Sequence, residues 1–145
     1  MTIQHHDYLG TPADVIAVAN AIARAEGFYV AKSIPQVHNN PGDLENHLGQ
    51  KIVFATEADG WGALYKQVEL MISGRSKIYN PSMSWTTIGA HYDGEVGYMD
   101  WVNNICKELG VQSTQTLQQF VDSFNKIKPI GIAVTDSINM VDSVG

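Results

Sequence analysis

The spacing of apolar residues, repeated in several segments with helix start and stop signals around them, most constrains the fold of this chain. The first such segment lies between Thr11-Pro12 and Gly27, and its apolar residues recur at three- and four-residue intervals: Val15, Val18, Ile22 and Ala25. Thr11 is expected to cap the helix, with Pro12 at its first position, and Gly27 favours a left-handed stop. The sequence therefore predicts a helix that ends at about Glu26.

The same pattern predicts further helices along the chain, at 57–73, 85–92, 95–109 and, as a short last helix, after residue 113 or 114. Residues 28–49 are rich in Pro, Gly and Asn and are predicted to form a structured loop. The short apolar run 51–54 favours one strand of a hairpin whose partner lies in that loop. The predicted fold is mainly α (α+β), with several helices around a core and a small β-hairpin.

Chain length predicts one domain, residues 1–127, followed by a C-terminal segment of different character. Residues 128–145 lack a helical period and are predicted to form an extended tail or linker. An alternative is that this segment packs on the domain in an extended conformation.

Charge and composition exclude several classes of function. The net charge is -6 and the nine Lys and Arg residues are scattered, which argues against nucleic-acid binding. No run of about 18 apolar residues and no secretory signal are found, so neither a membrane span nor Sec export is expected. The single cysteine, Cys106, lies in a predicted helix and is expected to pack against apolar neighbours. The histidines form no zinc pattern, and no phosphate loop or serine elbow is found, so no metal or cofactor is expected.

Glu26 is the strongest candidate for a catalytic residue. It falls beside the apolar face of the first predicted helix and at its C-terminal end. Burial and the negative end of the helix dipole both disfavour the carboxylate and raise its pKa. Cleavage of a glycosidic bond needs such an acid to protonate the leaving oxygen. The alternative is a solvated glutamate that merely ends a helix.

Several runs of residues, in order along the chain, resemble the lysozyme-like domains of phage and bacterial peptidoglycan hydrolases. They are AIARAEGF at 21–28, NNPGDL at 39–44, FAT at 54–56 with GWGAL at 60–64, and the stretches 85–92, 98–102 and 109–111. The resemblance covers about residues 11 to 122. It implies a mainly helical fold with a small sheet at the cleft, and it implies that Glu26 is the acid.

The resemblance also implies roles for residues in the loop. Asn39 and Asn40 would face the substrate or shape the loop, although asparagine before Pro-Gly equally suits turn formation. Asp43 stands where many relatives carry asparagine, so it could supply a second carboxylate. Glu45 and Glu57 are further candidates, but Glu57 lies in a capping sequence and suits a first-turn acid.

A tyrosine near the acid is also implied by the resemblance. Tyr98 matches that position, where its hydroxyl would bond the carboxyl group or the substrate, and Tyr92 could play the same part. The alternative for Tyr98 is a half-buried interior tyrosine. Lytic transglycosylases of this kind use a single glutamate, so a second carboxylate is not required.

Three hypotheses of function follow from these residues. The first is a peptidoglycan glycosidase, either a muramidase or a lytic transglycosylase, acting between N-acetylmuramic acid and N-acetylglucosamine. The second is a non-catalytic glycan-binding domain or a structural part of a phage particle. The third is a chitinase-like hydrolase. If the protein is encoded by a phage, it would act on the cell wall as a lysis or virion component.

Overall fold

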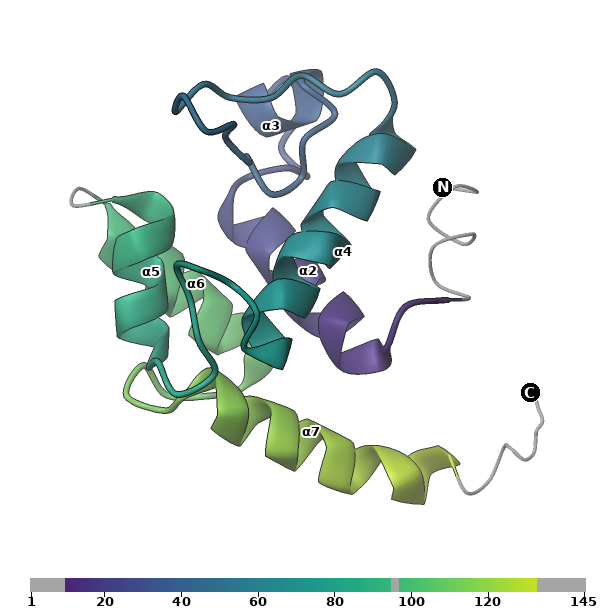
Figure 1. Ribbon diagram of the computed structural model, residues 1–145, viewed down its shortest axis with the longest axis vertical. Coiled ribbons are helices and arrows are strands. Elements are labelled where there is room, and N and C mark those ends of the chain that lie inside the picture. Colours follow the sequence, from purple (N-terminus) through teal and green to yellow (C-terminus); the bar gives the residue numbers. More distant parts are fainter. Residues whose placement is uncertain (1–9, 95–96, 133–145) are drawn as a thin grey trace.

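Helices make up most of the described chain, which comprises residues 10–94 and 97–132 of a computed structural model, with side chains described up to residue 126 (Figure 1). The helices are α2 (Ala13–Ala25), α3 (Ile34–Val37), α4 (Glu57–Ser73), α5 (Trp85–Asp93), α6 (Tyr98–Leu109) and α7 (Leu117–Ile132). This arrangement confirms the prediction of a mainly helical fold. Within the described residues, no helix is long and apolar enough to span a membrane.

The helix starts follow local capping in most cases. The Thr56 side chain accepts a hydrogen bond from the Asp59 N–H at 3.1 Å, and Ser84 accepts one from the Thr87 N–H at 3.1 Å. For α2 the predicted cap is wrong: Pro12 is extended, with φ −60° and ψ 147°, so it occupies the N-cap position itself. Pro12 has no side-chain acceptor, and no side-chain cap bond forms there.

The core lies where α2 passes between its neighbours. α2 packs against α4, α6 and α7, while α5 packs against α6. Fully buried apolar side chains from each of these helices meet there, among them Val18, Ile22, Leu64, Val68, Trp85, Ile88, Val102, Ile105 and Leu117. Because the C-terminal end of α2 leaves this core on the side of the Pro- and Asn-rich loop, Glu26 lies between the helical body and that loop.

The loop between α3 and α4, here called the loop arm (residues 38–56), lies with α3 at the opposite end of the molecule from α7 (Figure 1). The predicted hairpin is not confirmed as a pair of strands. Within the described chain, this region contains a single antiparallel bridge between Glu45 and Lys51. Hydrogen bonds from Asn46 N to Gln50 O (2.9 Å) and from Ile52 N to Leu44 O (3.0 Å) flank it.

Two physical features limit the pairing in the loop arm. Asp43 has a positive φ of 49°, which turns the chain immediately before the bridge. After Ile52 the backbone turns back, and Phe54 N donates to His38 O at 2.9 Å. Pairing is therefore confined to the few residues around the bridge.

The last helix is longer than the sequence predicted. α7 continues to Ile132, beyond the expected domain boundary at residue 127. The remainder of the predicted tail, residues 133–145, lies outside the described residues. The short helix α3 was not predicted; Ser33 caps it by accepting from Gln36 N, and Pro35 stands in its first turn.

Candidate active site

Glu26 occupies the C-cap position of α2. Gly27 has a φ of +82°, as predicted for a left-handed stop. Gly27 N donates to Arg24 O at 3.1 Å, and Phe28 N donates to Ala23 O at 3.0 Å. These two bonds form a Schellman motif, which satisfies carbonyl groups at the helix end. The side chain of Glu26 is consequently held at a fixed point beside the core.

Electrostatics at this position favour the protonated acid. Burial, followed by the charges of Asp93 and Asp43, raises the pKa of Glu26 from 4.5 to about 8. Two weaker influences lower it, a hydrogen bond from Trp101 and the charge of Lys51. Desolvation penalises the ion, and like charges penalise it further. Glu26 is therefore mainly protonated at neutral pH.

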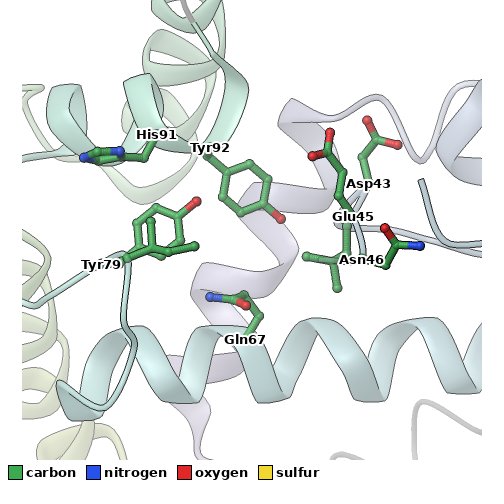
Figure 2. A pocket seen from close by; sticks show the side chains of 9 residues that line it. Asp43, Glu45, Asn46, Gln67, Tyr79, His91 and Tyr92 are labelled. Carbon is green, nitrogen blue, oxygen red and sulfur yellow. The ribbon is translucent and has the colours of Figure 1, made fainter. Parts of the chain in front are cut away.

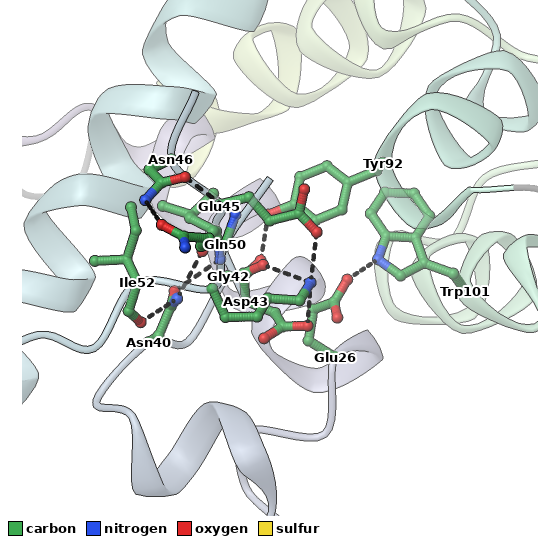
Figure 3. Close-up of polar contacts among 12 residues, drawn as sticks. Glu26, Asn40, Gly42, Asp43, Glu45, Asn46, Gln50, Ile52, Tyr92 and Trp101 are labelled. Carbon is green, nitrogen blue, oxygen red and sulfur yellow. Dashed lines mark hydrogen bonds and ion pairs between the residues drawn. The ribbon is translucent and has the colours of Figure 1, made fainter. Parts of the chain in front are cut away.

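Trp101, on α6, is the direct partner of the acid (Figure 3). Its indole N–H donates to Oε2 of Glu26 at 2.8 Å, and its side chain is only 2% exposed. Tyr92, on α5, stacks on Trp101 with ring centroids 5.0 Å apart and an interplanar angle of 23°. The Tyr92 hydroxyl donates to Gly42 O in the loop arm at 2.7 Å. These contacts link the acid and the loop arm through α6 and α5.

Tyr98, the predicted tyrosine, opens α6 and is half-buried against the core. The hydrogen bond to Glu26 instead comes from Trp101, one turn further along the same helix. Among the described contacts, Tyr92 is the tyrosine that stacks on Trp101 and bonds the loop arm. Burial, followed by the charge of Glu26, raises the pKa of Tyr92 well above the ordinary value.

Asn39 and Asn40 shape the loop arm. The Asn40 side chain is fully buried and donates to Leu44 O at 3.0 Å and Ile52 O at 2.9 Å, while its oxygen accepts from Leu44 N at 2.9 Å. Asn39 has a φ of 53° and donates to Phe54 O at 3.1 Å. Both amide groups are thus engaged with loop backbone.

Gly60, in the first turn of α4, lies against the same part of the loop arm. A Cβ added at this position would overlap the carbonyl oxygen of Asn39 and would lie 2.9 Å from Pro41 Cδ. Only glycine allows so close an approach of helix and loop. The GWGAL run thereby fixes the NNPG run in place.

Three charged residues of the loop arm form one cluster (Figure 3). Lys51 Nζ lies 2.8 Å from Asp43 Oδ2 and 3.0 Å from Glu45 Oε2, and it also donates to Asp43 O at 3.3 Å. Burial lowers the pKa of Lys51, but its bonds to Asp43 and Glu45 outweigh this effect and raise it. Asp43 Oδ1 is buried and has no hydrogen-bond partner within the described residues.

The remaining acidic residues differ in their placement. Asp93, the last residue of α5, is close enough for its charge to raise the pKa of Glu26. Glu57 lies in the first turn of α4, as its capping sequence predicted, and its carboxylate accepts from the Trp61 indole at 3.2 Å. Asp43 and Asp93 thus act electrostatically on the acid.

A pocket of about 220 Å³ adjoins this cluster (Figure 2). Its lining comes from the loop arm, α4, the segment after α4 and α5: Asp43, Leu44, Glu45, Asn46, Gln67, Ile78, Tyr79, His91 and Tyr92. It shares Asp43 and Tyr92 with the surroundings of Glu26. Burial is the largest cause that raises the pKa of Tyr79 to about 12, and the charge of Glu26 is the next. The charge of Glu26 therefore acts on Tyr79 as well.

Trp101, Lys51, Asp93 and Gln67 were not predicted as site residues from the sequence. Trp101 is separated from Glu26 by 75 positions, so no local spacing connects them. A tryptophan on the apolar face of α6 is equally typical of a core position. For metals, the described part of the chain contains no group of three or more His, Cys, Asp or Glu side chains able to hold an ion.

Comparison of the chain with protein-family models, with curated proteins and with solved structures found no significant match.

Proposed function

We propose that this protein is a peptidoglycan glycosidase, a muramidase or a lytic transglycosylase with a lysozyme-like arrangement, and that Glu26 is its general acid. The observation that carries the proposal is the pKa of about 8 at a half-buried glutamate that lies outside the pocket lining but whose charge acts on Tyr79 and Tyr92 in that lining. A strongly raised carboxyl pKa in a cleft is typical of an acid catalyst. The ordered resemblance to lysozyme-like domains supplies the class of substrate.

In this mechanism the protonated Glu26 donates its proton to the oxygen of the scissile glycosidic bond. As that bond breaks, positive charge develops on the sugar ring and Glu26 becomes a carboxylate. The Trp101 N–H, 2.8 Å from Oε2, stabilises the new carboxylate, because a hydrogen bond to a charged acceptor is stronger than one to a neutral acceptor. The carboxylate then accepts a proton from the attacking hydroxyl group or water.

The ion pairs of the loop arm favour the single-glutamate version of this mechanism. Asp43 and Glu45, the carboxylates of the loop arm, share the ammonium group of Lys51. That positive charge offsets the attraction that either carboxylate would exert on a cationic sugar ring. We therefore propose that a hydroxyl group of the substrate itself attacks, as in a lytic transglycosylase.

The experiment compares wild type with Glu26→Gln on purified bacterial cell walls and, in parallel, on chitin. We expect wild type to release soluble fragments from cell walls and Glu26→Gln to lose this activity by at least about 100-fold, the lower range for a general acid. Glu69→Gln, an exposed position on α4, is the matched control and should retain full activity.

The products distinguish the alternatives. Attack by a hydroxyl group of the substrate leaves a terminal sugar with an intramolecular anhydro ring and no new reducing end. Attack by water leaves a new reducing end. Equal release by wild type and Glu26→Gln would refute the role of Glu26. Glycan binding without release by wild type would instead support a binding domain, and release from chitin alone would support a chitinase-like enzyme.

A further inference from the structure

The pocket beside the acid combines apolar surface with several polar groups. Leu44 and Ile78 supply aliphatic surface, and Tyr79, a residue that is 7% exposed, supplies an aromatic ring. At about 220 Å³ the pocket is smaller than the roughly 300 to 1,000 Å³ typical of sites for drug-sized molecules. A single sugar ring, with apolar C–H faces and polar substituents, matches this size and lining.

Most polar groups of the pocket already have partners. Asn46 accepts from Leu48 N and Gln50 N and donates to the side chain of Gln50. Asp43 and Glu45 bind Lys51. The hydroxyl group of Tyr92, the other engaged group, donates to the loop arm. These groups are engaged with the protein, apart from Asp43 Oδ1, a buried acceptor that has no hydrogen-bond partner within the described residues.

Three further side chains of the pocket, Gln67, Tyr79 and His91, form no hydrogen bond with another described residue. Among these three, Gln67 carries both a carbonyl acceptor and an NH₂ donor. It lies on α4, is half-buried, and its carboxamide forms no hydrogen bond with another described residue. Figure 2 shows its side chain rising from α4 toward Tyr79 and Tyr92. A half-buried amide gains most from a ligand that satisfies both its carbonyl group and its NH₂ group.

An acetamido group has the matching chemistry. It carries one N–H donor and one C=O acceptor, which together can pair with the carbonyl and NH₂ groups of a glutamine. A hydroxyl group at the same carbon lacks the carbonyl acceptor and the methyl group. The aliphatic surface of Leu44 and Ile78 offers a place for that methyl group.

We propose that this pocket is a subsite for one N-acetylated sugar and that Gln67 is the residue that distinguishes an acetamido group from a hydroxyl group. The proposal rests on the proposed function, because it names the sugar feature that the site beside Glu26 recognises. Gln67 acts in binding and takes no part in proton transfer.

The test measures binding to the full chain carrying Glu26→Gln, so that a substrate would not be consumed. Isothermal titration calorimetry compares the β-1,4-linked tetramer of N-acetylglucosamine with that of glucose, which differs at the acetamido position. We expect the acetylated tetramer to bind about tenfold more tightly, the effect of one or two good hydrogen bonds. Adding Gln67→Ala should remove this preference.

Gln112→Ala, an exposed glutamine outside the pocket, is the matched control and should keep the preference. Circular dichroism spectra that match across the variants show that each is folded. Equal affinity for both tetramers, or a preference retained in Gln67→Ala, would overturn the role of Gln67.

The outcomes separate this proposal from the proposed function. If neither tetramer binds while wild type cleaves cell walls in a Glu26-dependent manner, the subsite is refuted and the proposed function stands. If binding depends on Gln67 but wild type cleaves no glycan, the subsite stands and the proposed function fails.

Discussion

Replacement of Glu26 by glutamine should make the folded protein more stable at neutral pH. The carboxyl group has a pKa of about 8 in the folded chain and an ordinary value of 4.5 when unfolded. Below pH 4.5 it is protonated in both states. Between pH 4.5 and 8 the unfolded chain releases a proton that the folded chain retains, so the free energy of unfolding falls as pH rises.

The magnitude follows from this pKa difference. Each pH unit within the window costs about 1.4 kcal/mol, so at pH 7 the cost reaches about 3 kcal/mol. Glutamine stays neutral at every pH, and its side-chain oxygen can still accept the hydrogen bond from Trp101. Glu26→Gln should therefore exceed wild type in free energy of unfolding by up to about 3 kcal/mol at pH 7, with no excess at pH 4.

Urea denaturation at unit pH intervals from 4 to 8 measures this difference, with equal m-values as the test of comparable unfolding. Glu69→Gln serves as the control, because an exposed ion pair contributes at most about 1 kcal/mol and should give a nearly flat difference. A Glu26→Gln difference that does not change with pH, or a more stable wild type at pH 7, would refute the reasoning.

Three further predictions concern the acid and the loop contact. Asp93→Asn removes a charge that raises the pKa of Glu26, so the alkaline limb of a pH–activity profile should move to lower pH. Trp101→Phe removes a hydrogen bond that lowers this pKa, so the limb should move to higher pH while the maximal rate falls; a shift in the same direction for both variants would contradict the assignment. Gly60→Ala should lower the free energy of unfolding by about 2 kcal/mol or more, because the new methyl group would overlap the loop arm. Gly62→Ala on the same helix is the control: a Cβ there would have no atom within 4 Å, so the free energy of unfolding should rise by up to about 1 kcal/mol. Chemical denaturation measures both changes.

The helices could be predicted because their signals are local. Thr56 and Ser84, residues of a type that favours helix starts, cap the helices that follow them, and Gly27 ends α2 as the sequence predicted. The start of α2 was misplaced because Thr-Pro is compatible with either residue as the cap. The mainly helical fold could be predicted without knowledge of long-range contacts, because periodic apolar positions already define the buried face of each helix.

The site was only partly predictable because its contacts join distant segments. Glu26 could be singled out from its place at the end of an apolar-faced helix, and its raised pKa agrees in direction with that argument. Its partner Trp101 comes from another helix, and the charge of Asp93 reaches it from the end of a third. The pairing of Asp43 and Glu45 with Lys51 depends on how the loop arm turns, which apolar periodicity does not describe.

The close contact between Gly60 and Asn39 restricts how a polymer could reach the acid. At Gly60 the loop arm packs against α4 so closely that no methyl group fits between them. The loop arm and the helix should therefore move together at this contact. If a polymer binds beside Glu26, residues 39–42 and α4 should therefore keep their relative positions during binding. Amide hydrogen exchange that is equally slow at Asn39 and Asn40, whose N–H groups bond Gln36 O and Pro35 O, and in the core of α4 would agree with this picture, and much faster exchange at Asn39 and Asn40 would contradict it.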